Sequence, residues 1–197
     1  MKKISFCLFT ICIGLLYSCG EAGIQSDISQ IVDVDPISIS IDVLPIFIGQ
    51  SVDETSPRTV STGPIDITSS EFSDYTDELQ KFTINKIYYT IRGFDQGNEA
   101  DLDVDMNVIL NGGNSIPVLS TLIVDVQNQT AKVLLYDKTN PGSVSAAAIS
   151  GIEGALLNGN SFVIEMVVVG RNVIFQSTSD EFQFQFEFDI TARVQLD

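Results

Sequence analysis

Residues 181–197 read E-F-Q-F-Q-F-E-F-D-I-T-A-R-V-Q-L-D, and every second residue from Phe182 to Leu196 is apolar. Gln, Glu, Asp, Thr and Arg fill the positions between them. Because successive side chains of a β-strand point to opposite faces, such a strand is apolar on one face and polar on the other. A helix has a period of 3.6 residues and could not gather these apolar residues on one stripe. The stretch therefore predicts a long strand of an antiparallel sheet with one face in water.

Alternation of the same kind predicts further strands upstream. They span residues 37–43, 82–94, 101–110 and 162–169. Pro45 interrupts the first of these, and Ile46-Phe47-Ile48 is expected to resume it. In residues 82–94, Ile87, Tyr89 and Ile91 share one face while Phe82 and Ile84 are out of phase with them, which predicts a β-bulge near Asn85. Residues 118–126 and 131–136 flank Gln127-Asn128-Gln129-Thr130 and predict a hairpin.

Two segments have helical spacing. Residues 69–79 place Phe72, Tyr75 and Leu79 at positions i, i+3 and i+7. Residues 143–157 are rich in Ala and end before Asn158-Gly159, a helix stop signal. The many short strands separated by turns predict an all-β domain over residues 36–197. We expect a two-sheet β-sandwich of jelly-roll or Greek-key type with one or two short helices.

The N-terminal residues have the features of an export signal. Lys2 and Lys3 precede residues 4–16, a predominantly apolar run that is shorter than the roughly 20 residues that cross a bilayer. We expect residues 1–18 to be a signal peptide. The segment Leu16-Tyr17-Ser18-Cys19 resembles the lipobox of bacterial lipoproteins, which has Leu three places before the Cys and a small residue just before it. The resemblance covers only about the first 19 residues.

The lipobox resemblance implies that Cys19 becomes the acylated first residue of the mature chain. It implies a lipid anchor, palmitate among its acyl chains, in the outer membrane of a Gram-negative-type envelope. Residues 19–35 would then act as a flexible tether, since they are polar and lack a period. The alternative is an ordinary secretory signal cut after Ser18, which would leave a free thiol.

Charge limits the partners of the chain. The formal net charge is −16, and removal of Lys2 and Lys3 with the signal would make it −18. Nucleic acids and anionic membrane surfaces are recognised by basic patches, so we expect neither as a partner of the folded domain. Cys7 and Cys12 lie within the signal, which leaves Cys19 alone and allows no internal disulfide.

The residue inventory also limits catalysis. The chain has no His, the usual general base and the commonest metal ligand. Serine, cysteine and zinc hydrolase sites built on His are therefore excluded. A pair of carboxylates could still perform glycoside hydrolysis, but no pair stands out among the 26 acids. We expect a protein that is not an enzyme and needs no cofactor.

Asp101, Asp103 and Asp105 are the most suggestive acidic residues. Their spacing is similar to that of a calcium loop, but Met106 stands where an EF-hand requires Gly. On a strand, alternate residues lie about 6.6 Å apart along one face, so three in a row do not encircle an ion. We interpret them as a solvated acidic face and keep calcium as the alternative.

Two functions are compatible with these features. The first is a binding or structural module that docks on another protein or a glycan through its loops or an edge strand. The second is a carrier that holds an apolar ligand between its sheets, against the wall formed by Phe182 to Phe188. A carrier should have a cavity behind that wall, whereas an interaction module should have a filled core.

Overall fold

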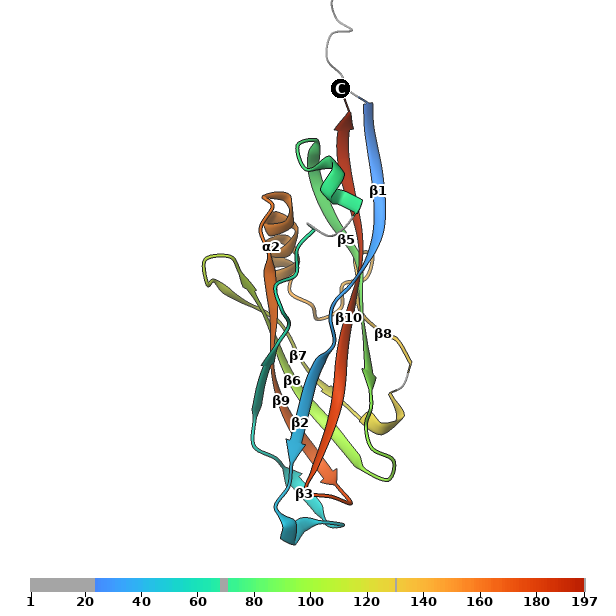
Figure 1. Cartoon of the computed structure of the whole chain (residues 1–197), viewed down its shortest axis with the longest axis vertical. Helices are drawn as coiled ribbons and strands as arrows, with labels where there is room; N and C mark the ends of the chain where they lie inside the picture. The colour runs from blue at the N-terminus through green and yellow to red at the C-terminus, as the bar shows by residue number, and fades with distance from the viewer. Residues whose placement is uncertain (1–23, 68–70, 130, 197) are drawn as a thin grey trace, which may run out of the picture.

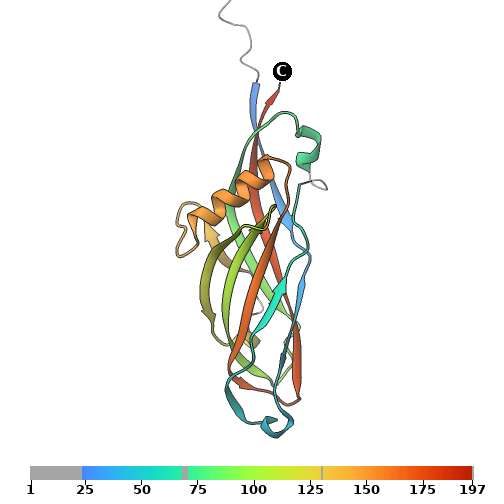
Figure 2. The same ribbon diagram turned by 90° about the vertical axis from the view of Figure 1, so that its left-hand side faces the viewer.

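The computed structural model describes residues 24–67, 71–129 and 131–196, and it shows two antiparallel five-stranded sheets packed face to face (Figures 1 and 2). The predicted two-sheet β-sandwich is confirmed. The strands are β1 (Ile24–Asp33), β2 (Ile37–Asp42), β3 (Ser51–Glu54), β4 (Arg58–Ser61), β5 (Leu79–Arg92), β6 (Glu99–Leu110), β7 (Ser115–Ile123), β8 (Val133–Asp137), β9 (Phe162–Ile174) and β10 (Ser179–Leu196).

The strand order is that of a jelly roll. One sheet runs β1-β10-β5-β8 with β2 also on β10, and the other runs β3-β9-β6-β7 with β4 also on β9. We call them sheet A and sheet B. We count β1/β2 and β3/β4 each as one interrupted strand, which gives eight strands. The first strand then pairs with the eighth, the second with the seventh, the third with the sixth and the fourth with the fifth: β1/β2 with β10, β3/β4 with β9, β5 with β8, and β6 with β7. This nested pairing of eight strands is the jelly-roll variant of the predicted fold.

Strand β10 is the central element of sheet A, as its sequence predicts. It has 18 residues, and its burial alternates from Asp180 to Val194. Phe182, Phe184, Phe186 and Phe188 are each at most 1% exposed. Their rings touch other rings of the core: the Phe184 centroid lies 5.0 Å from that of Tyr89 and 5.1 Å from that of Phe186.

The predicted helix forms as α2 (Ala146–Leu157). Ser145 caps its N-terminus by accepting a hydrogen bond from the Ala148 amide, and Gly159 follows its end with φ +65°. The helix packs on β5, β6 and β7 and so bridges the two sheets. The described residues also contain three 3₁₀ turns: η1 (Pro45–Phe47), η2 (Glu71–Tyr75) and η3 (Val126–Asn128). Of these, η2 lies within the predicted helical segment 69–79.

The bulge predicted near Asn85 is confirmed. Asp189 pairs with Lys86 and Ile190 pairs with Ile84, so Asn85 is skipped in the backbone ladder between β5 and β10. Backbone groups next to the bulge are hydrogen-bonded to elements other than β10. The Ile84 amide donates to Glu153 Oε1 of α2 at 2.9 Å, and the Asn85 carbonyl accepts from the Lys138 amide at 2.8 Å.

The prediction of a flexible tether over residues 19–35 is wrong for residues 24–33, because they form β1. All ten of its residues pair with β10, from Ile24 opposite Leu196 to Asp33 opposite Glu187. An ion pair between Asp27 and Arg193 adds to the ladder. Residues 19–23 lie outside the described residues. The strand was missed because the face that carries Ile28 and Val32 also carries Ser26 and Gln30, which hides the two-residue period.

Two further predictions are wrong. Residues 118–126 and 131–136 do not form a hairpin, because β7 pairs with β6 in sheet B and β8 pairs with β5 in sheet A. The intervening residues cross from one sheet to the other, and each strand finds a longer partner than its neighbour in sequence. Ile46-Phe47-Ile48 does not resume a strand either. It belongs to the turn around η1, since Pro45 starts a 3₁₀ turn there.

Candidate functional site

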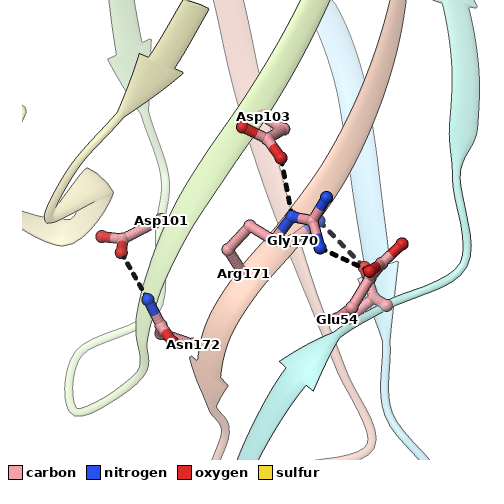
Figure 3. Close-up of polar contacts among 7 residues, drawn as sticks. Glu54, Asp101, Asp103, Gly170, Arg171 and Asn172 are labelled. Atoms are coloured by element: carbon pink, nitrogen blue, oxygen red, sulfur yellow. Dashed lines mark hydrogen bonds and ion pairs between the residues drawn. The ribbon is translucent and has the colours of Figure 1, made fainter.

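The acidic row predicted from the sequence lies on the outer face of sheet B, where Arg171 neutralises part of it. Figure 3 shows Arg171 on β9 between Asp103 of β6 and Glu54 of β3. Its Nε donates to Asp103 Oδ2 at 2.6 Å, and its Nη1 donates to Glu54 Oε2. The hydrogen bond from Arg171 to Asp103 and the charge of Glu54 raise the pKa of the guanidinium. These side chains are 36–56% exposed, so the network adds little stability.

Asp101 is also engaged. One carboxylate oxygen accepts from Asn172 Nδ2 and the other from the Asp125 amide, each at 2.9 Å. Asp105, the third member of the row, is exposed. Among the described residues, no three or more His, Cys, Asp or Glu side chains are arranged to hold a metal ion. The geometry therefore gives the row a structural explanation as part of a strand face crossed by hydrogen bonds.

Beside this row, β9 passes close to Thr55. The Gly170 amide donates to Thr55 Oγ1 at 2.9 Å, and the Thr55 amide donates to the Gly170 carbonyl at 3.0 Å. A Cβ on Gly170 would lie 2.8 Å from Val173 Cγ2 and 3.0 Å from Thr55 Oγ1. Only glycine fits without a shift of the neighbouring side chains, so this residue fixes how closely the chain after β3 approaches β9.

A buried carboxylate that the sequence analysis did not single out holds the loops at one end of the sandwich. Asp180 is 1% exposed and accepts hydrogen bonds from Asn98 Nδ2 at 2.8 Å and the Asp95 amide at 3.1 Å. Asn98 Oδ1 accepts in turn from the Gln176 amide at 2.7 Å. Burial raises the pKa of Asp180, although these hydrogen bonds oppose the shift. Asp180 and Asn98 thus connect the β5–β6 turn to the β9–β10 hairpin.

At the same end, the turn of residues 44–48 exposes apolar side chains. Leu44, Ile46 and Ile48 are 62%, 70% and 41% exposed. The backbone around them is held in place, because the Val43 amide donates to Thr178 O and the Gly49 amide donates to Phe175 O, at 2.9 and 2.8 Å. We call residues 44–48 the apolar turn. Its side chains are presented to solvent by a fixed backbone.

The chain begins its described part at the opposite end. Figures 1 and 2 show β1 and the C-terminal end of β10 together at one end of the long axis, with the loops around η1 at the other. The 18 residues of β10 connect the two ends, a distance of about 55 Å at roughly 3.3 Å per residue. Cys19, the predicted lipidation site, lies outside the described residues, five positions before Ile24.

The space behind the phenylalanine wall is occupied by side chains. Phe188 meets Phe162 of sheet B edge to face at 5.8 Å between ring centroids, and Phe182 meets Phe94 at 5.4 Å. Contacts at these distances fill the layer between the sheets. The wall is therefore part of a packed core, as expected for an interaction module.

Comparisons with known proteins add little. No family model matches the sequence, and no curated protein matches it. Among solved structures, the chain is similar to one from Desmodium yellow mottle tymovirus, with 12% identity, a TM-score of 0.35, and coverage of 87% of this chain and 85% of that one. A structure of infectious bursal disease virus, Gx strain, gives 9% identity, a TM-score of 0.30, and coverage of 86% and 37%. Likenesses this weak carry no argument about function.

No helix in the described part of the chain is both long and apolar enough to span a bilayer.

Proposed function

We propose that the protein is a non-enzymatic, lipid-anchored module of the outer membrane that binds a partner protein through the apolar turn. The observation that carries this proposal is the position of the turn. Leu44, Ile46 and Ile48 are exposed at one end of β10, whereas β1, which follows Cys19 by only a few residues, pairs with the other end. An anchor at Cys19 would hold the sandwich by one end and direct the apolar turn away from the membrane.

The chemistry of the turn favours a protein over the other partners. Sugar rings stack on aromatic side chains, but the exposed residues here are aliphatic apart from the half-buried Phe47. Insertion into the anchoring membrane would require the turn to fold back over about 55 Å, the length of β10. A protein surface with an apolar pocket can cover these aliphatic side chains. The fixed backbone of the apolar turn lowers the entropy lost on binding.

The carrier is the second candidate and has less support. A carrier would need a cavity between the sheets, but ring contacts of 5.0–5.8 Å occupy that layer along Phe182 to Phe188. The packed core therefore favours the interaction module.

The anchor is tested by replacing Cys19 with Ala. We expect the variant to move from the detergent phase to the aqueous phase in a detergent-partition assay. An intact mass of the mature wild-type protein without acyl chains would show that Cys19 is not the anchor.

The apolar turn is tested by photo-crosslinking in cells. A photoreactive amino acid replaces Ile46 in one strain and Leu134 in another; Leu134 is 49% exposed but lies on the edge strand β8. We expect one discrete protein adduct from position 46, which Leu44→Asp abolishes, and no such adduct from position 134. Equal adducts from both positions, or none from position 46, would refute the assignment of the turn.

A further inference from the structure

The few cations of this acidic chain are concentrated on one sheet. Of its ten Lys and Arg residues, eight follow residue 23. Six of the eight lie on the outer face of sheet A or beside it: Lys81, Lys86, Arg92, Lys132, Lys138 and Arg193. Within the described residues, three cations form no ion pair, namely Lys81, Arg92 and Lys138. Two of these three, Lys81 and Lys138, line the same hollow.

The hollow lies on the outer face of sheet A and has a volume of about 260 Å³. Its lining is entirely polar and comes from four separate stretches of chain: Asp27, Lys81, Thr83, Asn85, Lys138, Thr191 and Arg193. We call it the basic hollow. In contrast to the apolar turn, it lies beside the paired ends of β1 and β10, close to where the chain leaves toward Cys19.

The bulge at Asn85 shapes the basic hollow. Because it adds one residue to β5, the side chains of both Asn85 and Lys86 face outward. Asn85 Nδ2 donates to Thr191 Oγ1 at 2.9 Å and to Asp189 Oδ1 at 3.0 Å. The Asn85 carbonyl holds the Lys138 amide, which brings this lysine from the end of β8 to the hollow. Each lining residue is thus placed by a backbone or side-chain contact.

The acidic side chains near the hollow are already in ion pairs or accept hydrogen bonds. Arg193 donates to both carboxylate oxygens of Asp27, at 2.8 and 3.1 Å, and the hydrogen bond lowers the pKa of this acid. Asp189 accepts from Asn85 and stands opposite Lys86 in the ladder. What remains available to a ligand is the ammonium groups of Lys81 and Lys138 and the hydroxyl of Thr83. The basic hollow therefore carries an uncompensated positive charge on a protein whose net charge is −16.

We infer that the basic hollow binds a phosphoryl group. Two ammonium groups and a hydroxyl suit a compact tetrahedral anion, because lysine acts as a point charge with freely rotating donors. A planar carboxylate is recognised best by a bidentate guanidinium, and the only one lining the hollow, Arg193, is occupied by Asp27. The volume falls just below the roughly 300 Å³ at which pockets begin to enclose larger ligands. The group can belong to a lipid headgroup or to a free phosphorylated compound.

The test is calorimetric titration of the purified protein in neutral detergent with inorganic phosphate, glycerol 3-phosphate and glycerophosphoglycerol. Acetate at equal ionic strength is the control anion. Loss of one charge-assisted hydrogen bond should weaken binding about tenfold, so we expect this effect from Lys81→Gln and from Lys138→Gln. Arg92→Gln is the matched control, because Arg92 is an unpaired cation on the same strand as Lys81 but does not line the hollow. It should change the affinity less than twofold.

The outcomes show whether the basic hollow binds a phosphoryl group and which kind of molecule supplies that group. Saturable binding that prefers glycerol 3-phosphate supports a free phosphate monoester, and a preference for glycerophosphoglycerol supports a lipid headgroup. Equal binding of acetate, an equal loss in Arg92→Gln, or no saturable binding of any phosphate would overturn the inference. Urea unfolding of each variant shows whether the fold is retained, which the exposure of Lys81 and Lys138 leads us to expect.

Discussion

Replacement of Phe186 with Ala tests the organisation of the core most directly. Phe186 lies in the middle of β10, is 0% exposed, and packs against Phe184 with ring centroids 5.1 Å apart. Its neighbours at both alternate positions, Phe184 and Phe188, are themselves fully buried and cannot move to fill the space. The variant therefore loses the transfer free energy of the ring and leaves a cavity, which together cost about 3–5 kcal/mol. For a domain of this size, that corresponds to a fall in Tm of roughly 6–20 °C.

The matched control is Gln183→Ala, three residues earlier on the same strand. Gln183 is exposed on the outer face of sheet A and pairs with Arg92. Its loss should change the free energy of unfolding by no more than about 0.5 kcal/mol. Both variants are unfolded in urea under the same conditions, with the slope checked to ensure that only the midpoint differs. If the two midpoints shift equally, the strand is not buried on one face, and the sandwich as described is refuted.

Three further predictions concern individual residues. Gly170→Ala should destabilise the fold by about 1–3 kcal/mol in urea, because its Cβ would lie 2.8 Å from Val173 Cγ2; an unchanged midpoint would show that Val173 and Thr55 yield freely. Burial raises the pKa of Asp180 above 3.8, so the contribution of Asp180 to stability should be full below that pH and decline as the pH rises through the raised value. The difference in free energy of unfolding between the wild type and Asp180→Asn should therefore shrink as the pH rises. A difference that does not depend on pH would contradict the shift. Millimolar calcium should raise the Tm no more than sodium at equal ionic strength, because Arg171 occupies Asp103; a rise with calcium alone, lost in Asp103→Asn, would establish a site.

The sequence predicts those features that depend on local periodicity. The alternation of residues 182–196 and 101–110 identified β10 and β6, and the change of phase between Ile84 and Ile87 located the bulge. Features that depend on distant partners were missed. Strand β1 has few apolar residues, and it forms because the backbone of residues 187–196 on β10 offers it a pairing edge. The crossing between β7 and β8 was taken for a hairpin, because a turn signal does not identify the sheet to which the next strand belongs.

The candidate sites show the same division. The sequence placed Asp101, Asp103 and Asp105 on one strand face, but it could not show that Arg171, 68 residues after Asp103, would bridge to Glu54. Asp180 was not singled out from the sequence, although a signal for its burial existed. The register that turns Phe182 and Phe184 inward also turns residue 180 inward. The exposure of the apolar turn had no comparable signal, because Ile46-Phe47-Ile48 has the composition of a strand.

The bulge at Asn85 connects the core to the basic hollow. In a strand, a shift of one residue moves every side chain to the other face. Phe82 and Ile84 precede Asn85, and Ile87 and Tyr89 follow it, and all four are buried. If the same sequence paired with β10 without a bulge, burial of Ile87 and Tyr89 would turn Phe82 and Ile84 outward and Lys81 inward. The bulge therefore keeps the core continuous and keeps Lys81 in the hollow at the same time. The Asn85 carbonyl at the bulge also accepts from the Lys138 amide. The residue that keeps the core in phase therefore also helps to form the basic hollow, in which we expect the phosphoryl group to bind.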